Sequence, residues 1–214
     1  FVPDHERLNN MKPFTTLTAV AAPIDMANID TDRIIPVRFL RKLRNDKAGY
    51  EGYLFHDVRF DNTGQEKPDF VLNKPAFRRA GIIVAGANFG CGSSREGAVY
   101  ALLDYGIRAV IAPSFGDIHY ANELQNGMLP VTLPEEICRG LRDQLQANPG
   151  ATLSIDLTAQ TVTDTEGTAH PFTIDPVYKE RLLKGLDDIG LVMEQLPGIE
   201  SFEHNYHAER PWLA

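Results

Sequence analysis

The chain has 214 residues, 43% hydrophobic and 23% charged, which is the composition of an ordinary globular protein with room for one substantial core. Its net charge of −8 argues against a nucleic-acid-binding surface, and no apolar run is long enough to span a membrane. No basic segment precedes an apolar one near the N-terminus, so we expect a cytoplasmic protein without a signal peptide.

The first elements follow one another closely. Thr15 to Ala22 is rich in β-formers and predicts the first strand. Residues 28–32 are typical of a turn, and Ile34 to Leu43 then predicts a short helix with Pro36 in its first turn. Residues 45–52 are polar, contain two glycines and show no period, which indicates a mobile loop of the kind that gates a substrate.

A glycine-rich stretch then joins a buried strand to a helix. The strand is predicted at 81–85 and the helix at 95–104, and the stretch between them reads Gly86-Ala-Asn-Phe-Gly-Cys-Gly-Ser-Ser-Arg-Glu96. Ser93, Ser94 and Arg95 therefore lie where the helix begins, at free N–H groups and the positive end of the helix dipole. Such a place favours an anion, and the planar guanidinium of Arg95 suits a carboxylate.

A structural interpretation of the same residues stays open. Either serine can be the N-cap of the helix, and Ser93 with Glu96 matches a capping box. In the earlier turn, Asp30, Thr31 and Asp32 are good N-cap types, although Thr31 or Asp32 can instead support the Ser93 turn in space. The glycine spacing matches neither a Walker A loop nor a dinucleotide-binding fingerprint.

The second half of the chain alternates strands with helices, which predicts an α/β domain. Strands are expected at 108–112, 129–133, 152–157, 160–164 and 172–174, and helices at 115–125, 134–146, 178–183 and 187–196. This alternation alone favours a parallel, doubly wound sheet. We expect one domain over 11–196, with 1–10 as a disordered extension or cloning remnant and 197–214 as a tail without a clear period, whose Trp212 docks on this chain or another.

The two cysteines, Cys91 and Cys138, are too few to hold a [4Fe–4S] cluster, and a disulfide framework is not expected in a reducing compartment. The six histidines show no metal-binding spacing, so we expect no metal on this chain. Cys91 is interpreted as a small buried thiol.

Gly90-Cys-Gly-Ser-Ser-Arg-Glu96 resembles the Gly-x-Gly-Ser-Ser-Arg-Glu signature of the aconitase superfamily swivel domain. Residues 28–36 resemble an early Thr-Asp-x-Ile signature of the same domain. Further matches, in order, are to the separate small subunits of bacterial 3-isopropylmalate dehydratases, and they lie at 53–57, 68–73, 111–115 and 185–190. The resemblance covers roughly 12–195 and implies a swivel-like β/β/α domain, with a mixed sheet or barrel flanked by helices, in place of the doubly wound sheet.

The resemblance also implies a function. Such a hydro-lyase subunit isomerises 2-isopropylmalate to 3-isopropylmalate by dehydration and rehydration in leucine biosynthesis. It is active only with a large subunit, expected in a heterodimer or higher heteromer, and that partner carries the [4Fe–4S] cluster. By motif position Ser93 is the catalytic base, acting as an alkoxide. The expected substrate-binding residues are Ser94, Arg95, Arg44 and Arg41, and the supporting residues are Thr31, Asp32, Gly90, Gly92 and Glu96.

One departure keeps alternatives open. The family commonly has His directly after Ser-Ser-Arg-Glu, and this chain has Gly97. The alternatives are a small subunit for another diacid (homoaconitate, citraconate or 2-methylmalate, or dimethylmalate) and a binding module that holds a metabolite or phosphate without chemistry. A swivel-like domain with only a structural role is a third.

Overall fold

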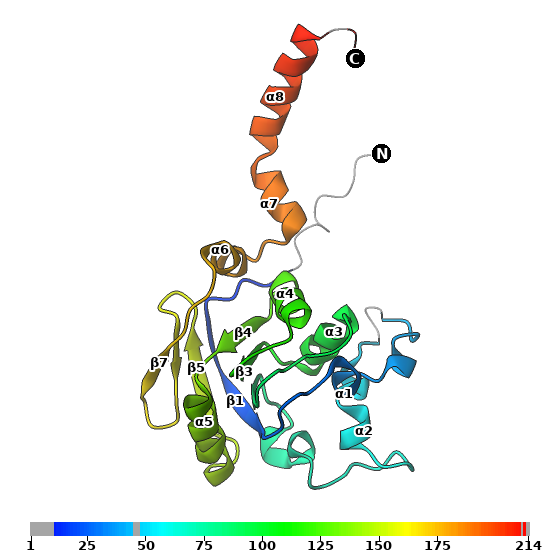
Figure 1. Ribbon diagram of the computed structural model, residues 1–214, viewed down its shortest axis with the longest axis vertical. Coiled ribbons are helices and arrows are strands. Elements are labelled where there is room, and N and C mark those ends of the chain that lie inside the picture. Colours follow the sequence, from blue (N-terminus) through cyan, green and yellow to red (C-terminus); the bar gives the residue numbers. More distant parts are fainter. Residues whose placement is uncertain (1–10, 45–47, 211, 213–214) are drawn as a thin grey trace.

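The computed structural model describes residues 11–44, 48–210 and 212, so the expectation for 1–10 and part of that for the 45–52 loop lie outside the described residues. A seven-stranded sheet has the order β4-β3-β2-β1-β5-β6-β7 and is flanked by helices (Figure 1). The strands are β1 (Thr16–Ile24), β2 (Ile82–Ala85), β3 (Ala109–Ala112), β4 (Leu129–Thr132), β5 (Thr152–Asp156), β6 (Thr161–Thr163) and β7 (Ala169–Pro171). The helices are α1 (Thr31–Ile34), α2 (His56–Arg59), α3 (Glu96–Tyr105), α4 (Asp117–Gln125), α5 (Glu135–Ala147), α6 (Pro176–Lys184), α7 (Asp188–Glu194) and α8 (Leu196–Glu209).

Strand β1 joins a parallel half of the sheet to an antiparallel half. Its last residues pair in parallel with β2, Ala21 opposite Ile82, and β3 and β4 continue this parallel half. Its first residues pair antiparallel with β5, Thr16 opposite Asp156, and β6 and β7 complete an antiparallel half. The prediction of a mixed sheet is therefore confirmed, and the parallel doubly wound sheet is wrong. The sheet has edges at β4 and β7, so it is not a closed barrel.

The parallel half is buried on both faces. Along β2, Ile83 belongs to one core with Leu102 of α3, and Ile82 belongs to a second core with Leu141 of α5. All four residues of β2 and all four of β3 are buried, as expected of parallel strands covered by helices on both sides. Two cores thus hold the sheet rigidly between α3 and α5.

The carboxyl ends of the parallel strands bring three loops together. Because β1, β2 and β3 point the same way, the loops that follow them leave one edge of the sheet. Bridges join these loops, Asp30 with Cys91 and Phe89 with Phe115. The glycine-rich turn therefore lies between the loop after β1 and the loop after β3.

The helix predicted at 34–43 is wrong. Helix α1 begins at Thr31 and ends at Ile34, and Ile35 is extended, with φ −141° and ψ 113°. Ile35 precedes Pro36, whose ring disfavours the helical conformation of the residue before it. A separate 3₁₀ turn, Val37–Phe39, begins after the proline.

The strand predicted at 172–174 lies earlier, at Ala169–Pro171. A tight turn after β6 fixes this register, since the Asp164 N–H donates to the Thr168 carbonyl and the Asp164 carboxylate accepts from the Thr168 N–H. The turn sets Ala169 opposite Thr163, so pairing ends at Pro171 and Phe172 follows as a buried core residue.

The C-terminal segment is helical rather than irregular. Helix α8 runs from Leu196 to Glu209 and has no buried residue, and α7 and α8 lead away from the sheet (Figure 1). A helix that buries no face gives no hydrophobic period, which is why the sequence pattern did not indicate it. Trp212 is 75% exposed and does not dock on the described part of this chain. No helix within the described residues combines the length and apolar character that crossing a membrane needs.

Candidate active site

The Ser93 turn, residues 86–95, is fastened to the loop that follows β1. The Gly90 N–H donates to the Ile29 carbonyl at 2.7 Å, and the Thr31 N–H donates to the Cys91 carbonyl at 3.0 Å. The Thr31 hydroxyl, buried with the rest of its residue, donates to the Ser93 carbonyl at 2.8 Å. These bonds fix the backbone on both sides of the two serines.

Glycine is required at residue 90 for two reasons. Its φ is +70°, in the left-handed region that side chains disfavour, and Gly92 has φ +90°. A Cβ at residue 90 would also lie 2.1 Å from the ring of His119. The backbone of the turn therefore packs directly on the side chain of His119 in α4.

The predicted capping box is wrong. Helix α3 begins at Glu96, and its N-cap is Arg95, which has an extended backbone and no side-chain cap bond. Ser93 therefore lies too far before the helix to cap it, and Glu96 accepts a hydrogen bond from Asn126 Nδ2 at 3.0 Å instead. The hydroxyls of Ser93 and Ser94 are exposed and bond to none of the described residues.

Asp32 lies against Arg95. Its Oδ1 is 2.5 Å from Nη1 of Arg95, whose side chain is 15% exposed, compared with 54% for Asp32. Asp30 caps α1, with its carboxylate accepting from the Arg33 N–H at 2.7 Å, so neither Thr31 nor Asp32 is the cap. Both instead contact the Ser93 turn from the side.

A cavity of about 180 Å³ opens between the starts of α3 and α4. Its lining residues are Thr31, Gly90, Gly92, Ser93, Ser94, Arg95, Gly116, Asp117, Ile118 and His119. The N-termini of two helices therefore meet at one small cavity, each with free N–H groups and a positive dipole end. Together with Arg95 and the two hydroxyls, this arrangement suits a carboxylate.

The two other predicted arginines lie elsewhere. Arg44 donates to both carboxylate oxygens of Asp104, at 2.9 and 2.7 Å, and stacks over Tyr100. The hydrogen bonds with Asp104 raise the pKa of Arg44. Asp104 is near the end of α3, about 12 Å along the helix from its start. Arg41 is exposed, and neither arginine borders the cavity.

Sequence reasoning missed His119 and Glu123, which are 2% and 0% exposed on α4. Nε2 of His119 lies 3.0 Å from Oε1 of Glu123. Four residues apart, the two share one face of the helix, but an oppositely charged pair at this spacing is typical of a solvated helix face. The four-residue spacing of His119 and Glu123 was the only sequence signal for this pair, and such spacing usually indicates an exposed helix face.

The described residues do not fit an iron–sulfur cluster. No group of three or more His, Cys, Asp or Glu side chains among them is placed to hold a metal ion. Cys138 is fully buried in the core, and burial raises the pKa of its thiol to about 11, whereas a cluster ligand must be a thiolate. Cys91 is half-buried rather than buried, so that interpretation is only partly right.

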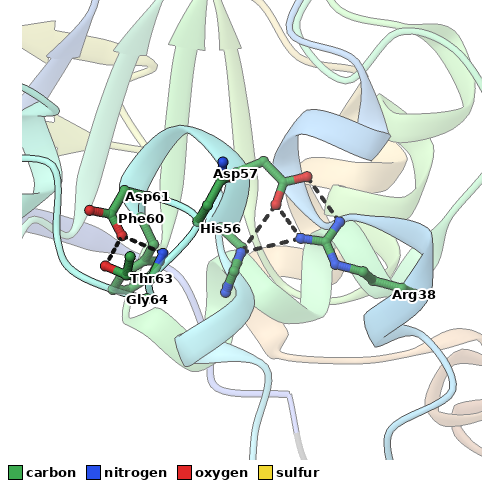
Figure 2. A pocket seen from close by; sticks show the side chains of 8 residues that line it. Arg38, His56, Asp57, Phe60, Asp61, Thr63 and Gly64 are labelled. Carbon is green, nitrogen blue, oxygen red and sulfur yellow. Dashed lines mark hydrogen bonds and ion pairs between the residues drawn. The ribbon is translucent and has the colours of Figure 1, made fainter.

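A second hollow, of about 720 Å³, lies beside α2 (Figure 2). Figure 2 shows Arg38 and His56 both directed at the Asp57 carboxylate. Asp61 accepts from Thr63 within its own loop. The charged groups of this hollow already bond one another. We therefore consider it a weaker candidate for a ligand site than the 180 Å³ cavity beside Ser93, which we call the Ser93 cavity.

The family model of the aconitase C-terminal domain matches residues 11–136, and a second model, LeuD_N, matches 140–176. The fold and the Ser93 turn thus define a swivel-type domain of the aconitase class. A 3-isopropylmalate dehydratase small subunit of Roseobacter denitrificans is 50% identical over 203 residues, covering 95% of this chain and 100% of that protein. A protein of the same name from a Jannaschia species is 51% identical over the same share of both.

A solved structure agrees with this assignment. The crystal structure of a 3-isopropylmalate dehydratase from Methanocaldococcus jannaschii has a TM-score of 0.63 and 27% identity. The match covers 87% of this chain and 99% of that one. The chain belongs to the family of 3-isopropylmalate dehydratase small subunits.

Gly97, where the resemblance leads one to expect histidine, lies close to the side chain of Leu40. A Cβ at this position would lie 2.4 Å from Cδ2 of Leu40, which packs against the first turn of α3. A larger residue at 97 would need the Leu40 side chain to move. The glycine therefore occurs where Leu40, in the segment that follows α1, packs closely against α3.

Proposed function

We propose that this chain is the small subunit of a 3-isopropylmalate dehydratase, and that it helps convert 2-isopropylmalate to 3-isopropylmalate in leucine biosynthesis. The observation that carries the proposal is the Ser93 turn, which opens on a carboxylate-sized cavity between two helix N-termini. The close identity to dehydratase small subunits over nearly the whole chain supports it.

Dehydration removes a proton from a carbon next to a carboxylate, and rehydration returns water at the neighbouring carbon. In our proposal Ser93 is the base. A serine hydroxyl is a weak acid, so its anion needs donors and positive charge nearby. The start of α3 and the guanidinium of Arg95 supply that environment. Ser94 and Arg95 would hold one substrate carboxylate.

The second carboxylate needs a further cation, for which Arg44 and Arg41 remain our candidates. Arg44 would have to leave Asp104 to reach the cavity. Arg44 is 39% exposed, but Asp104 is only 15% exposed, and the Arg44 guanidinium bonds both oxygens of that carboxylate. A substrate carboxylate would therefore have to replace two hydrogen bonds to Asp104.

The leaving hydroxide requires a Lewis acid, and we propose that a separate large subunit supplies it as a [4Fe–4S] cluster. The dehydratase would then be active only as a complex of the two subunits, which we place in the cytoplasm. The name of the relatives, small subunit, supports a larger partner. The alternative within the family is another diacid, because the chain has Gly97 where the resemblance leads one to expect histidine.

The test is co-expression with the candidate large subunit under anaerobic conditions, followed by assay on a panel of 2-hydroxy diacids. We expect turnover of 2-isopropylmalate by the complex and none by this chain alone. Preferred turnover of 2-methylmalate or homoaconitate would establish the alternative substrate. Binding of a diacid by a complex that turns over none of the panel would leave the chain as a binding module.

A further inference from the structure

Helix α4 places a buried ionisable pair at the wall of the Ser93 cavity. His119 and Glu123 are 2% and 0% exposed, and Nε2 lies 3.0 Å from Oε1. The Ser93 chemistry proposed above uses neither of them. Burying two such groups is costly unless each polar atom finds a partner.

The pair has no other partner among the residues that the structure describes. Both ring nitrogens and both carboxylate oxygens are buried without a hydrogen bond to any further group. Burial raises the pKa of the Glu123 carboxyl, and the contact with His119 only partly opposes this. A buried pair without net charge holds two protons, one of which lies between Oε1 and Nε2.

That shared proton decides the state of the other ring nitrogen. Whether it lies nearer oxygen or nitrogen, the second proton of the pair is on Nδ1 of His119. Nδ1 is thus an N–H donor that is buried without an acceptor in the described chain, an arrangement that proteins rarely tolerate. An acceptor from outside the chain would satisfy it.

The cavity is where such an acceptor can sit. His119 lines it together with Ser93, Ser94 and Arg95. Its ring lies against the Gly90 backbone, since a Cβ there would meet Cδ2 at 2.1 Å, and its centroid is 5.5 Å from that of Phe89. The Cδ2 edge of the ring is consequently held against the turn, at the border of the cavity.

We propose that His119 is a further substrate-binding residue, whose Nδ1–H donates to a carboxylate oxygen of the dicarboxylate in the Ser93 cavity. Glu123 is then a positioning residue, because it engages Nε2 and leaves the proton on Nδ1. The identification of the dicarboxylate as substrate rests on the proposed function. Arg95 contacts Asp32 as well as the bound ligand in this proposal. A further hydrogen-bond donor from His119 would therefore strengthen binding of the anion.

Two amide variants provide a matched test. The nitrogen of an asparagine side chain reaches about as far as Nδ1 of histidine, whereas that of glutamine reaches about as far as Nε2. We expect His119→Asn to bind the anion nearly as the wild type does, and His119→Gln to bind it about 10- to 100-fold more weakly, the loss for a hydrogen bond to a charged group. The probe is 2-isopropylsuccinate, which lacks the hydroxyl that dehydration removes, titrated by calorimetry into the reconstituted complex.

A third variant separates binding from packing. In His119→Phe/Glu123→Leu the buried pair is replaced by apolar side chains, a change that is often neutral or stabilising for a fold. We expect this variant to melt at or above the wild-type temperature and yet to bind the probe about 10- to 100-fold more weakly. A packing role alone would instead leave the affinity unchanged.

The outcomes are distinguishable. Equal affinities for His119→Asn and His119→Gln would overturn the inference, as would wild-type affinity in the apolar variant. A wild-type complex that binds the probe but does not turn over 2-isopropylmalate would refute the proposed function alone. Loss of affinity confined to His119→Gln and the apolar variant would still support the donor role of His119.

Discussion

Arg95 and Asp32 join the start of α3 to α1 through a contact of 2.5 Å between Nη1 and Oδ1. The Asp32 carboxylate is half-exposed, whereas the Arg95 guanidinium is largely buried. The guanidinium is therefore held in place by protein groups rather than by water. With Nη1 beside Asp32, the remaining N–H groups of the planar fork are available to a ligand. Arg95 can therefore be fixed by the protein and still bind a carboxylate.

Arg95→Lys should be a damaging change, although the charge is kept. A lysine cannot contact Asp32 and a substrate carboxylate with one rigid fork. We expect affinity for a non-reactive diacid to fall by ~1.5–3 kcal/mol, the range for a hydrogen bond to a charged group. Calorimetry on the reconstituted complex measures this. Arg139→Lys is the control, since Arg139 is exposed on α5 and does not border the cavity, and equal losses in both variants would remove Arg95 from the site.

Ser93→Ala should abolish turnover and leave stability unchanged. Loss of a general base costs ~10²–10⁴-fold in rate. Ser93 does not cap α3, and the bond it accepts from Thr31 is to its backbone carbonyl, so the fold loses no interaction. The free energy of unfolding should stay within ~0.5 kcal/mol of the wild type. Near-normal kcat in the complex would assign the base to another residue. Ser94→Ala removes the neighbouring, substrate-binding hydroxyl, so it should raise KM more than it lowers kcat.

Sequence pattern anticipated the elements that bury a face. The apolar runs at 81–85 and 108–112 correctly predicted β2 and β3. A strand covered by helices on both faces is apolar throughout, so its sequence is easily recognised. Helices α3, α4 and α5 were anticipated to within two residues at each end, since each packs one side on the sheet. The same argument explains why α8 was not predicted. The helix has no buried face, so its sequence shows no hydrophobic periodicity.

The mixed sheet and the details of the site depended on more than periodicity. Pattern gives no information on whether β5 pairs parallel or antiparallel with β1, and only the resemblance indicated a mixed sheet. The Ser93 turn was located from its glycines and its position between strand and helix. His119 and Glu123 were missed because burial of a charged pair follows from what packs over it, here the Gly90 backbone.

The Arg38–Asp57 pair should make stability depend on pH in acid. Hydrogen bonds from Arg38, with a smaller contribution from His56, lower the pKa of Asp57 from 3.8 to about 2. A carboxyl whose folded pKa is depressed stabilises the fold above its unfolded pKa, and this contribution is lost as the pH falls through the folded value. Because both side chains are more than half exposed, we expect Asp57→Asn to lower the free energy of unfolding by only ~0.2–1 kcal/mol at pH 7.

Urea unfolding at pH 7, 4, 3 and 2 measures the effect of Asp57→Asn. The difference from the wild type should shrink between about pH 4 and pH 2, the interval between the unfolded and folded pKa values. Asp69→Asn is the control, as an acidic residue without such a partner among the described residues. A difference that persists unchanged at pH 2 would show that the ion pair is not its source.

Thr31→Val should loosen the Ser93 turn without creating a cavity, because valine replaces the buried hydroxyl with a methyl group of similar size. The Thr31 hydroxyl donates to the Ser93 carbonyl at 2.8 Å, and its loss should cost ~0.5–1.5 kcal/mol in unfolding by urea. The larger effect should be on kcat, since a base displaced by about 1 Å can lose 10²-fold in rate. Thr31→Ser keeps the donor and loses only the methyl group, so it should retain most of the activity. If serine and valine at this position lower kcat equally, the hydrogen bond to Ser93 does not position the base, and the role of Thr31 is limited to packing beneath the turn.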